Sequence, residues 1–247
     1  MASGLMTGRR VLVVGASSGI GAAIARSVVE AGGDVTVSAR RADRLQELVA
    51  EMGAGHAVAG DATSAEHARQ VADTAAELMG GIDLMVYVAG LGILQRLRDT
   101  DPDTWQRVFS VNVIGANLAA AAALDHVGRD GIIAFMSSRT TIDANAYFAS
   151  YSSTKAALDQ CIRTWRVEHP ERRFVRIVMG NTQPTEFANQ MGFDLLGPAL
   201  EAWGRQAVPG GMMHTDDVSR LLVKKLALAL DHPEVDSSEL QFDARLA

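Results

Sequence analysis

The chain has 247 residues, of which 48% are hydrophobic and 21% charged, the balance of an ordinary globular protein. Its net charge of -6 argues against a nucleic-acid partner, and no apolar run approaches the roughly 18 residues of a membrane span. The single cysteine, Cys161, excludes an intrachain disulfide, and the histidines form no metal-binding cluster. Because the first residues lack a secretion signal, we expect a cytoplasmic, metal-independent protein with one domain over residues 1–247.

Short apolar runs alternate along the chain with segments of helical periodicity. Strands are predicted at 11–14, 35–38, 56–59, 84–88, 132–136 and 174–178. Helices are predicted at 21–30, 44–52, 65–79, from Pro102 into an alanine-rich stretch, and at 149–167. The connections are too long for hairpins, so the pattern predicts a doubly wound α/β fold, a parallel sheet with helices on both faces.

One long irregular region, 186–213, follows the sixth predicted strand. It is too apolar for a solvated linker, since it contains Phe187, Met191, Trp203 and several leucines. It is either a helical excursion packed on the core or a lid over a substrate pocket, and we favour the lid.

A glycine-rich turn joins the first strand to the first helix. Gly15 permits the tight turn, Gly19 lets the backbone approach a pyrophosphate at the helix N-terminus, and Gly21 allows close packing. Three glycines in this strand–helix context predict a dinucleotide site, whereas the glycines alone would suit a plain turn. The turn also contributes Ser17, Ser18 and Ile20.

The end of the second strand indicates which dinucleotide binds. An acidic residue there would bind the ribose 2′-hydroxyl of NAD, but the sequence has Arg40 and Arg41 instead. Arginine pairs well with a 2′-phosphate, which favours NADP(H), although both arginines could also be solvated caps. Asp61 follows the third strand and either accepts from the adenine amino group or caps a helix.

The candidate chemistry lies in Tyr151 and Lys155, which share one face of a helix. A nearby ammonium stabilises a phenolate and lowers its pKa, so the pair could move a proton to or from a carbonyl oxygen. Ser138, at the end of the fifth strand, could hold that oxygen, and its spacing to Tyr151 favours it over Ser137. Asn112 either satisfies backbone groups in a helix kink or holds a water in a relay to Lys155.

These motifs together resemble the short-chain dehydrogenase/reductase family over residues 9–229. The resemblance rests on the glycine turn, Asp61, Ala89-Gly90, Asn112, Ser138 and the Tyr151/Lys155 pair. It implies a Rossmann-like sheet of about seven strands, a tetrad of Asn112, Ser138, Tyr151 and Lys155, no metal, and a homodimer or homotetramer. In such tetramers the central helices, here the alanine-rich stretch 116–124 and the helix of Tyr151, pack between subunits.

The resemblance also implies further coenzyme contacts, and the sequence departs from the family at several of them. Val14 replaces a threonine, Tyr87-Val88 replaces two asparagines, and Met179-Gly180 replaces Pro-Gly. In relatives the loop after Gly180 contacts the nicotinamide amide through a threonine, here Thr182 or Thr185. The expected set of coenzyme contacts also includes Lys155, Ala62, Ala89, Gly90 and Gly180.

The sequence thus predicts an NADP(H)-dependent oxidoreductase that interconverts a ketone or aldehyde and an alcohol. Its small-molecule substrate is expected to be hydrophobic, with pocket residues Ser138, Arg139, Leu91, Ile93, Asn145 and Phe148. Two alternatives are a coenzyme-binding sensor or scaffold without turnover, and an enzyme of the same fold with other chemistry, such as enoyl reduction or dehydration. A sensor should lack the tyrosine or the lysine, and enoyl reducers usually space these two residues wider than four.

Overall fold

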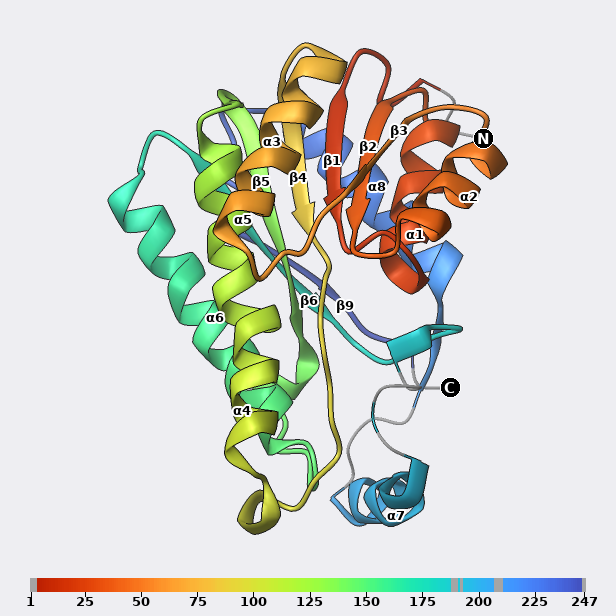
Figure 1. Cartoon of the computed structure of the whole chain (residues 1–247), viewed down its shortest axis with the longest axis vertical. Helices are drawn as coiled ribbons and strands as arrows, with labels where there is room; N and C mark the ends of the chain where they lie inside the picture. The colour runs from red at the N-terminus through yellow and green to blue at the C-terminus, as the bar shows by residue number, and fades with distance from the viewer. Residues whose placement is uncertain (1–3, 188–190, 192, 207–210, 246–247) are drawn as a thin grey trace.

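Figure 1 shows the computed structural model of the chain, which describes residues 4–187, 191, 193–206 and 211–245. Seven parallel strands form one sheet in the order β3-β2-β1-β4-β5-β6-β9. Their bounds are β1 Arg10–Val14, β2 Asp34–Ala39, β3 His56–Ala59, β4 Ile82–Tyr87, β5 Val127–Ser138, β6 Arg173–Met179 and β9 Glu239–Phe242. The predicted Rossmann-like doubly wound sheet is confirmed.

Helices cover both faces of this sheet. One face carries α1 Gly19–Glu30, α2 Ala42–Met52 and α8 Thr215–Asp231, and the other carries α3 Ala65–Met79, α5 Gly115–Leu124 and α6 Ala149–Glu168 (Figure 1). The helix α4 Pro102–Phe109 continues into α5 through a π-helical segment, Ser110–Ile114. A short helix, α7 Leu196–Arg205, and a two-residue pair of strands, β7 Thr182–Gln183 and β8 Met213–His214, lie apart from the main sheet.

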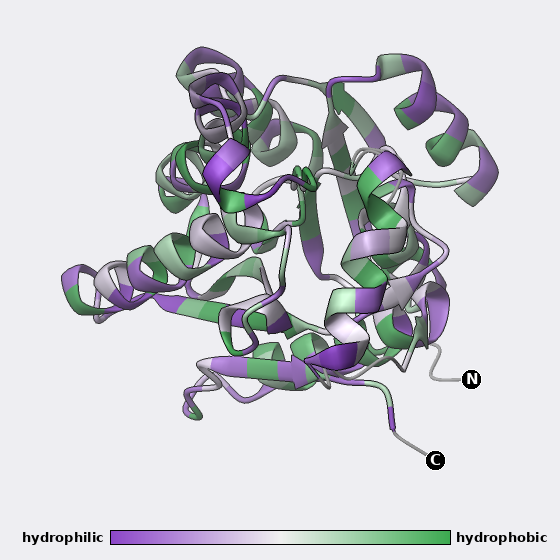
Figure 2. Cartoon of the chain, turned by 90° about the horizontal axis from the view of Figure 1, so that it is seen from below, coloured by the Kyte–Doolittle hydropathy of each residue, from purple (hydrophilic) through white to green (hydrophobic). Residues whose placement is uncertain are grey.

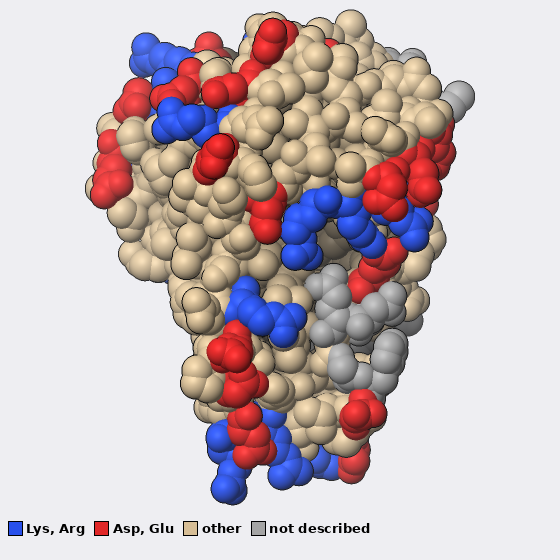
Figure 3. Space-filling view, viewed as in Figure 1, with Lys and Arg blue, Asp and Glu red and all other residues tan. Residues whose placement is uncertain are grey.

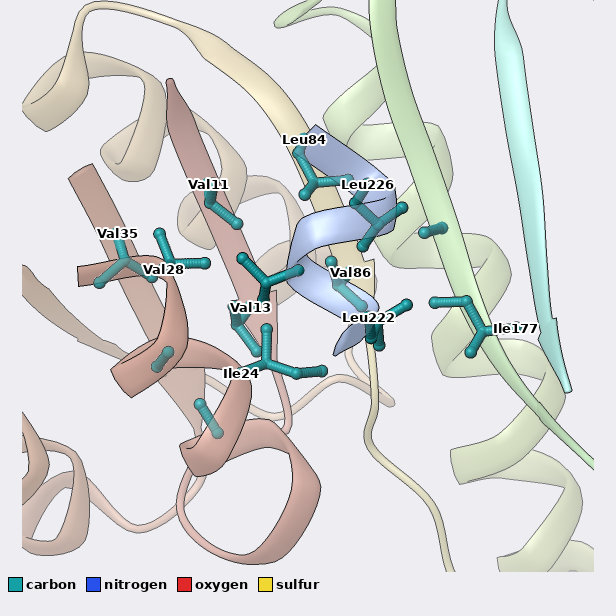
Figure 4. Packing of buried hydrophobic residues seen from close by; sticks show 14 of the residues in the cluster. Val11, Val13, Ile24, Val28, Val35, Leu84, Val86, Ile177, Leu222 and Leu226 are labelled. Atoms are coloured by element: carbon teal, nitrogen blue, oxygen red, sulfur yellow. The ribbon is translucent and has the colours of Figure 1, made fainter. Parts of the chain in front are cut away.

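The first core lies between the sheet and the helices α1 and α8. Figure 4 shows Ile24 and Val28 of α1 and Leu222 and Leu226 of α8 against valines and leucines of β1, β2 and β4. These strand residues are β-branched or leucine on consecutive positions because a parallel sheet buries both of its faces. Hydrophobic and hydrophilic residues alternate along the outer helices, as expected for helices that bury one face (Figure 2).

The second core contains the alanine-rich helix. By length and composition, the helical run Pro102–Leu124 could cross a membrane, which differs from the expectation that no segment would qualify. It packs against α3 and α6, however, and Ala116, Ala119, Ala120 and Ala123 are buried against the sheet. Small side chains let α3 and α5 approach closely, so this run is a core helix of the fold.

The sequence located the main helices and strands up to β6 but none of the elements after it. The predicted bounds of β3 and α3 are those observed, and Asp101 caps α4 by accepting from the backbone N of Thr104 at 2.8 Å. Strand β5 starts five residues earlier than predicted because Val127 already pairs with Ile82 of β4, before a shift in register that resumes at Ile132. Helix α8 and strand β9 were not predicted individually; β9 has only four residues, too few for its alternation of polar and apolar side chains to mark a strand.

The contribution of α8 to the core is testable on two neighbouring leucines. Leu226 is fully buried, whereas Leu228 on the same helix is 54% exposed. We expect Leu226→Ala to lower the free energy of unfolding by about 2–5 kcal/mol because it leaves a cavity. Leu228→Ala should change it by less than about 0.5 kcal/mol. Urea unfolding followed by circular dichroism measures both, and equal losses would contradict the position of α8.

Candidate active site

A cleft of about 1480 Å³ opens at the carboxyl ends of β1, β2, β4, β5 and β6. The chain leaves β1 toward β2 and β3 and returns to the other side of β1 with β4, so the cleft lies at a switch in strand order, where α/β proteins bind ligands. Figure 3 shows a hollow on this face with basic side chains along its edge and acidic side chains nearby. Of the predicted site residues, only Asn112 and Ile93 are not part of the lining.

The glycine turn is built for close backbone approach. Gly15 has φ 97°, and a Cβ there would lie 2.4 Å from the backbone N of Ala89. A Cβ on Gly21 would lie 2.3 Å from the carbonyl oxygen of Gly15. The glycines therefore let the start of α1, the end of β1 and the segment after β4 pack closely together. The first backbone N–H groups of α1, which have no partner within the helix, then face the cleft.

Arg41 lies beside this turn at the end of β2. Its Nη2 donates to the hydroxyl oxygens of Ser17 at 2.9 Å and Ser18 at 3.2 Å, and it pairs with Glu186 Oε2 at 2.9 Å. Arg40 also lines the cleft and acts electrostatically on Asp61. Two guanidinium groups and two hydroxyls thus gather at one end of the cleft, a donor set suited to a phosphate.

Asp61 has a structural role in the turn after β3. Its Oδ1 accepts from the backbone N of Thr63 at 2.9 Å and from the Thr63 hydroxyl at 2.8 Å. The hydrogen bonds from Thr63, opposed by burial and aided by Arg40, lower the pKa of Asp61. This geometry matches the turn-stabilising alternative, and Asp61 also borders the cleft.

Tyr151 and Lys155 are both buried at the centre of the cleft, on the first turns of α6. Lys155 Nζ donates to the backbone carbonyl of Met136 in β5 at 2.7 Å and lies 5.6 Å from the centre of the Tyr151 ring. Burial lowers the pKa of Lys155 to about 8, against the effect of the Asp159 carboxylate, which raises it. The lysine is therefore tied to the strand that carries Ser138.

The expected depression of the Tyr151 pKa is wrong for the protein alone. Burial raises the pKa of Tyr151 to about 12, and a hydrogen bond with Ser138 acts in the opposite direction. The Lys155 ammonium does not offset this desolvation, because its Nζ donates to the Met136 carbonyl and lies 5.6 Å from the centre of the Tyr151 ring. At neutral pH the phenol is protonated and can donate a hydrogen bond.

Successive serines of β5 face opposite sides of the strand. Ser138 hydrogen-bonds with Tyr151 and accepts from the Thr140 backbone N at 3.2 Å. Ser137 donates to the buried Asp159 carboxylate at 2.6 Å. Ser138 is therefore the serine beside Tyr151, as its spacing predicted, because side chains alternate along a strand.

Asn112 lies in the π-helical segment and is fully buried. Its Oδ1 accepts from the backbone N of Leu91 at 2.8 Å, and its Nδ2 donates to the Leu91 carbonyl and the Thr154 hydroxyl, both at 2.9 Å. A Cβ on Gly90 would lie 3.7 Å from Asn112 Oδ1 and 3.8 Å from Lys155 Nζ. Asn112 thus fastens the segment after β4 to α6 next to Lys155, and such π-segments are frequent at functional sites.

Thr185 and Thr182 differ in what they contact. Thr185 lies against the glycine turn, its Cβ 3.4 Å from the position of a Cβ on Gly19. Thr182 donates its hydroxyl hydrogen to the Gly180 carbonyl at 3.0 Å and pairs in β7 with β8. Thr185 is therefore the threonine that lies at the glycine-turn end of the cleft.

The predicted pocket residues divide into three kinds. Leu91 and Phe148 line the cleft, and Phe148 stacks on Tyr151 with ring centres 4.5 Å apart. Arg139 is paired with Asp143 at 3.0 Å and Asp243 at 2.9 Å. Ile93 was wrong as a lining residue: its neighbour Leu94 is the one that packs beside Phe148 and Tyr151.

The region predicted as a lid contributes aromatic residues to the end of the cleft that contains Tyr151 and Phe148. The ring centres of Phe187 and Tyr151 are 5.2 Å apart. The ring centres of Phe148 and Trp203, which belongs to α7, are 6.0 Å apart. Residues 188–190, 192 and 207–210 of that region lie outside the described residues. The described part, with α7, is a helical excursion that also borders the cleft.

Three residues that bear on the site belong to no motif. Asp159 is buried one helical turn after Lys155 and pairs with Arg176 Nη2 at 2.6 Å. Its four-residue spacing from Lys155 could have indicated in the sequence that the two side chains share one face of the helix. Glu186 and Phe187 lie in an irregular region, where no periodicity predicts which side chain turns inward.

The comparisons with known proteins agree with this geometry. Residues 9–193 match the family model for short chain dehydrogenase. The chain belongs to the short-chain dehydrogenase family. The matched region includes the glycine turn, Ser138 and the Tyr151/Lys155 pair, so the resemblance expected from these motifs is confirmed.

Similar proteins of this family come from bacteria, fungi and archaea. The chain is 35% identical to an uncharacterized oxidoreductase of Methylorubrum extorquens over 62% of this chain and 64% of that one. It is 28% identical to versicolorin reductase 1 of Dothistroma septosporum over 86% of this chain and 79% of that one. A crystal structure of an alcohol dehydrogenase from Thermococcus sibiricus, complexed with 5-hydroxy-NADP, superposes with a TM-score of 0.80 at 26% identity over 95% of both chains.

The position of Asp159 leads to a prediction about pH. Its carboxylate stabilises the Lys155 ammonium, so Asp159→Asn should lower the pKa of Lys155 further below about 8. A rate that needs the ammonium would then fall at lower pH, and the alkaline limb of the pH–rate profile should shift toward acid.

The matched control is Asp236→Asn, which removes an exposed aspartate paired with Arg166. Circular dichroism shows whether each variant is folded, since Asp159 also pairs with Arg176. A folded Asp159→Asn protein with the wild-type pH profile would refute the link to Lys155.

Proposed function

We propose that the protein is an NADP(H)-dependent oxidoreductase that interconverts a ketone or aldehyde and an alcohol. The observation that carries this proposal is the convergence of Tyr151, Ser138 and Lys155 at the centre of a cleft whose other end holds the glycine turn. A proton donor and a dinucleotide cradle in one cleft are what hydride transfer to a carbonyl requires.

The residues at the coenzyme end fit an NADP dinucleotide. Gly15 and Gly21 let the start of α1 pack against the end of β1 and the segment after β4, and the backbone N–H groups of that helix start suit a pyrophosphate. Arg40 and Arg41 offer cations for a 2′-phosphate. The Thermococcus sibiricus relative was crystallised with 5-hydroxy-NADP, which supports the same choice. The other residues proposed to contact the coenzyme also line the cleft: Ser17, Ser18, Ile20, Asp61, Ala62, Ala89, Gly90, Gly180, Thr182 and Thr185.

When bound, the reduced coenzyme supplies the hydride. In the reductive direction Tyr151 donates its phenolic proton to the carbonyl oxygen, so that the carbonyl gains one hydride and one proton and becomes an alcohol. Its pKa of about 12 keeps the phenol protonated at neutral pH, which suits a donor. Ser138 holds the same oxygen beside Tyr151, and solvent then returns a proton to the tyrosine.

Lys155 and Asn112 support this transfer. Lys155 places a cation beside the Tyr151 ring, where it stabilises the phenolate left after proton transfer, and it binds the nicotinamide ribose. Asn112 holds the segment of Leu91 against α6 and stands next to Lys155, where it can support a proton relay.

The substrate end favours an uncharged, apolar carbonyl compound. Phe148 and Phe187 pack on Tyr151, and Trp203 packs on Phe148. Arg139, by contrast, is neutralised by two carboxylates and is a poor partner for an anionic substrate. Asn145 also borders the cleft.

The remaining expectations stay predictions. They are a single domain with a lid at 186–213, a cytoplasmic location, and a homodimer or homotetramer. The half-exposed Ile114 at the junction of the π-helical segment and α5 suits a subunit contact along the central helices.

The proton donor is tested by Tyr151→Phe, which removes one oxygen from a buried ring. We expect the rate of NADPH oxidation with a ketone to fall by roughly 10²- to 10⁴-fold, the usual contribution of a positioned acid. NADPH affinity, measured by fluorescence titration, should stay within about 2-fold. Tyr147→Phe is the matched control, because Tyr147 has no lysine four residues on. Retained turnover in Tyr151→Phe would assign the proton to another group.

The choice of coenzyme is tested by Arg40→Ala. Loss of a charge-assisted hydrogen bond should weaken NADPH binding by roughly 10- to 100-fold and NADH binding by less than about 3-fold. Calorimetric titration with both coenzymes measures the two changes. Arg44→Ala, on the exposed side of α2 and outside the cleft lining, is the control. Equal weakening of both coenzymes would remove Arg40 from the 2′-phosphate.

A further inference from the structure

An ion pair crosses the coenzyme end of the cleft. Arg41, just after β2, and Glu186, at the start of the region predicted as a lid, are joined from Nη2 to Oε2 at 2.9 Å. Glu186 follows Thr185, which lies against Gly19 of the glycine turn. The pair therefore passes over the start of α1, where the phosphates of a dinucleotide are expected.

Glu186 occupies Nη2 of Arg41, a donor that a 2′-phosphate would need. The same Nη2 of Arg41 also contacts the hydroxyls of Ser17 and Ser18, and all four residues line the cleft. The hydrogen bond from Arg41, against the opposing effect of burial, lowers the pKa of Glu186, so this side chain is an anion at neutral pH. Arg41 Nη2 has two N–H hydrogens, and Glu186, Ser17 and Ser18 already share them, so a phosphate that binds this nitrogen competes with the carboxylate for it.

We propose that Glu186 is a specificity-determining residue that competes with the coenzyme 2′-phosphate for Arg41. This inference rests on the proposed NADP(H) function. A coenzyme with the phosphate must displace the carboxylate from Arg41, whereas one without it leaves the ion pair intact. Glu186 therefore reduces the preference for NADP(H) below the level that Arg41 and the two serines would otherwise give.

The competition is measured with two nucleotide fragments that differ only by the phosphate, 2′,5′-ADP and 5′-AMP. We expect Glu186→Gln to tighten 2′,5′-ADP binding by roughly 3- to 10-fold, a modest effect because Arg41 and Glu186 are both partly exposed. Binding of 5′-AMP should change by less than about 2-fold. Isothermal titration calorimetry gives both constants without any turnover.

Two comparisons separate competition for Arg41 from a general change of charge. In an Arg41→Ala background, Glu186→Gln should leave the affinity for 2′,5′-ADP unchanged, because the contested donor is gone. Glu201→Gln, which breaks the exposed pair between Glu201 and Arg205 in α7, should leave both affinities of the otherwise wild-type protein unchanged. Equal tightening of both nucleotides by Glu186→Gln, or the same gain without Arg41, overturns the inference.

The outcomes for the proposed function are distinct. If the wild type prefers 2′,5′-ADP and Glu186→Gln changes neither affinity, the NADP(H) assignment stands and the role of Glu186 is refuted. If the wild type binds both fragments equally and Glu186→Gln creates a preference, the competition stands and the proposed NADP(H) preference is refuted. A wild-type protein that binds neither fragment refutes both.

Discussion

The site depends on the hydrogen bond between the Lys155 ammonium and the Met136 carbonyl. A buried ammonium is costly unless an acceptor is supplied, and here the acceptor belongs to β5, two residues before Ser138. The bond fixes α6 against the carboxyl end of β5, and that contact sets Tyr151 beside Ser138. Asp159, one turn further along α6, continues the connection through Ser137 and Arg176. The site is therefore held by the same buried polar contacts that join helix to sheet.

Burial has opposite consequences for the two groups that share this contact. It raises the pKa of Tyr151 and lowers that of Lys155, because it disfavours the charged form of each. The motif Tyr-x-x-x-Lys alone suggests the reverse for the tyrosine. A protonated phenol is nevertheless the form needed to reduce a carbonyl. Oxidation of an alcohol would instead need the phenolate, which the Lys155 ammonium beside the ring would have to stabilise.

The two ends of the cleft have different chemistry. The coenzyme end gathers arginines and serines around the glycine turn, and the substrate end gathers aromatic rings around Tyr151. Glu186 and Phe187 are neighbours in sequence, yet one contacts Arg41 and the other lies over Tyr151. The beginning of the region predicted as a lid thus contacts both ends, which would let the two ligands influence each other.

Local patterns were sufficient to predict most of the fold and most of the residues that line the cleft. The alternation of apolar strands with helical segments determined a parallel sheet, and the glycine spacing predicted the tight turn after β1, because both follow from short-range sterics. The choice of Ser138 over Ser137 followed from its spacing to Tyr151, and the structure adds that the two serines face opposite sides of β5. Only the tertiary structure decided the partners of Arg41, Arg139 and Asp159, the packing of α8 and β9, and the direction of the Tyr151 pKa. Those properties depend on burial and on contacts between residues far apart in the chain, such as Arg139 with Asp243, and no local spacing encodes them.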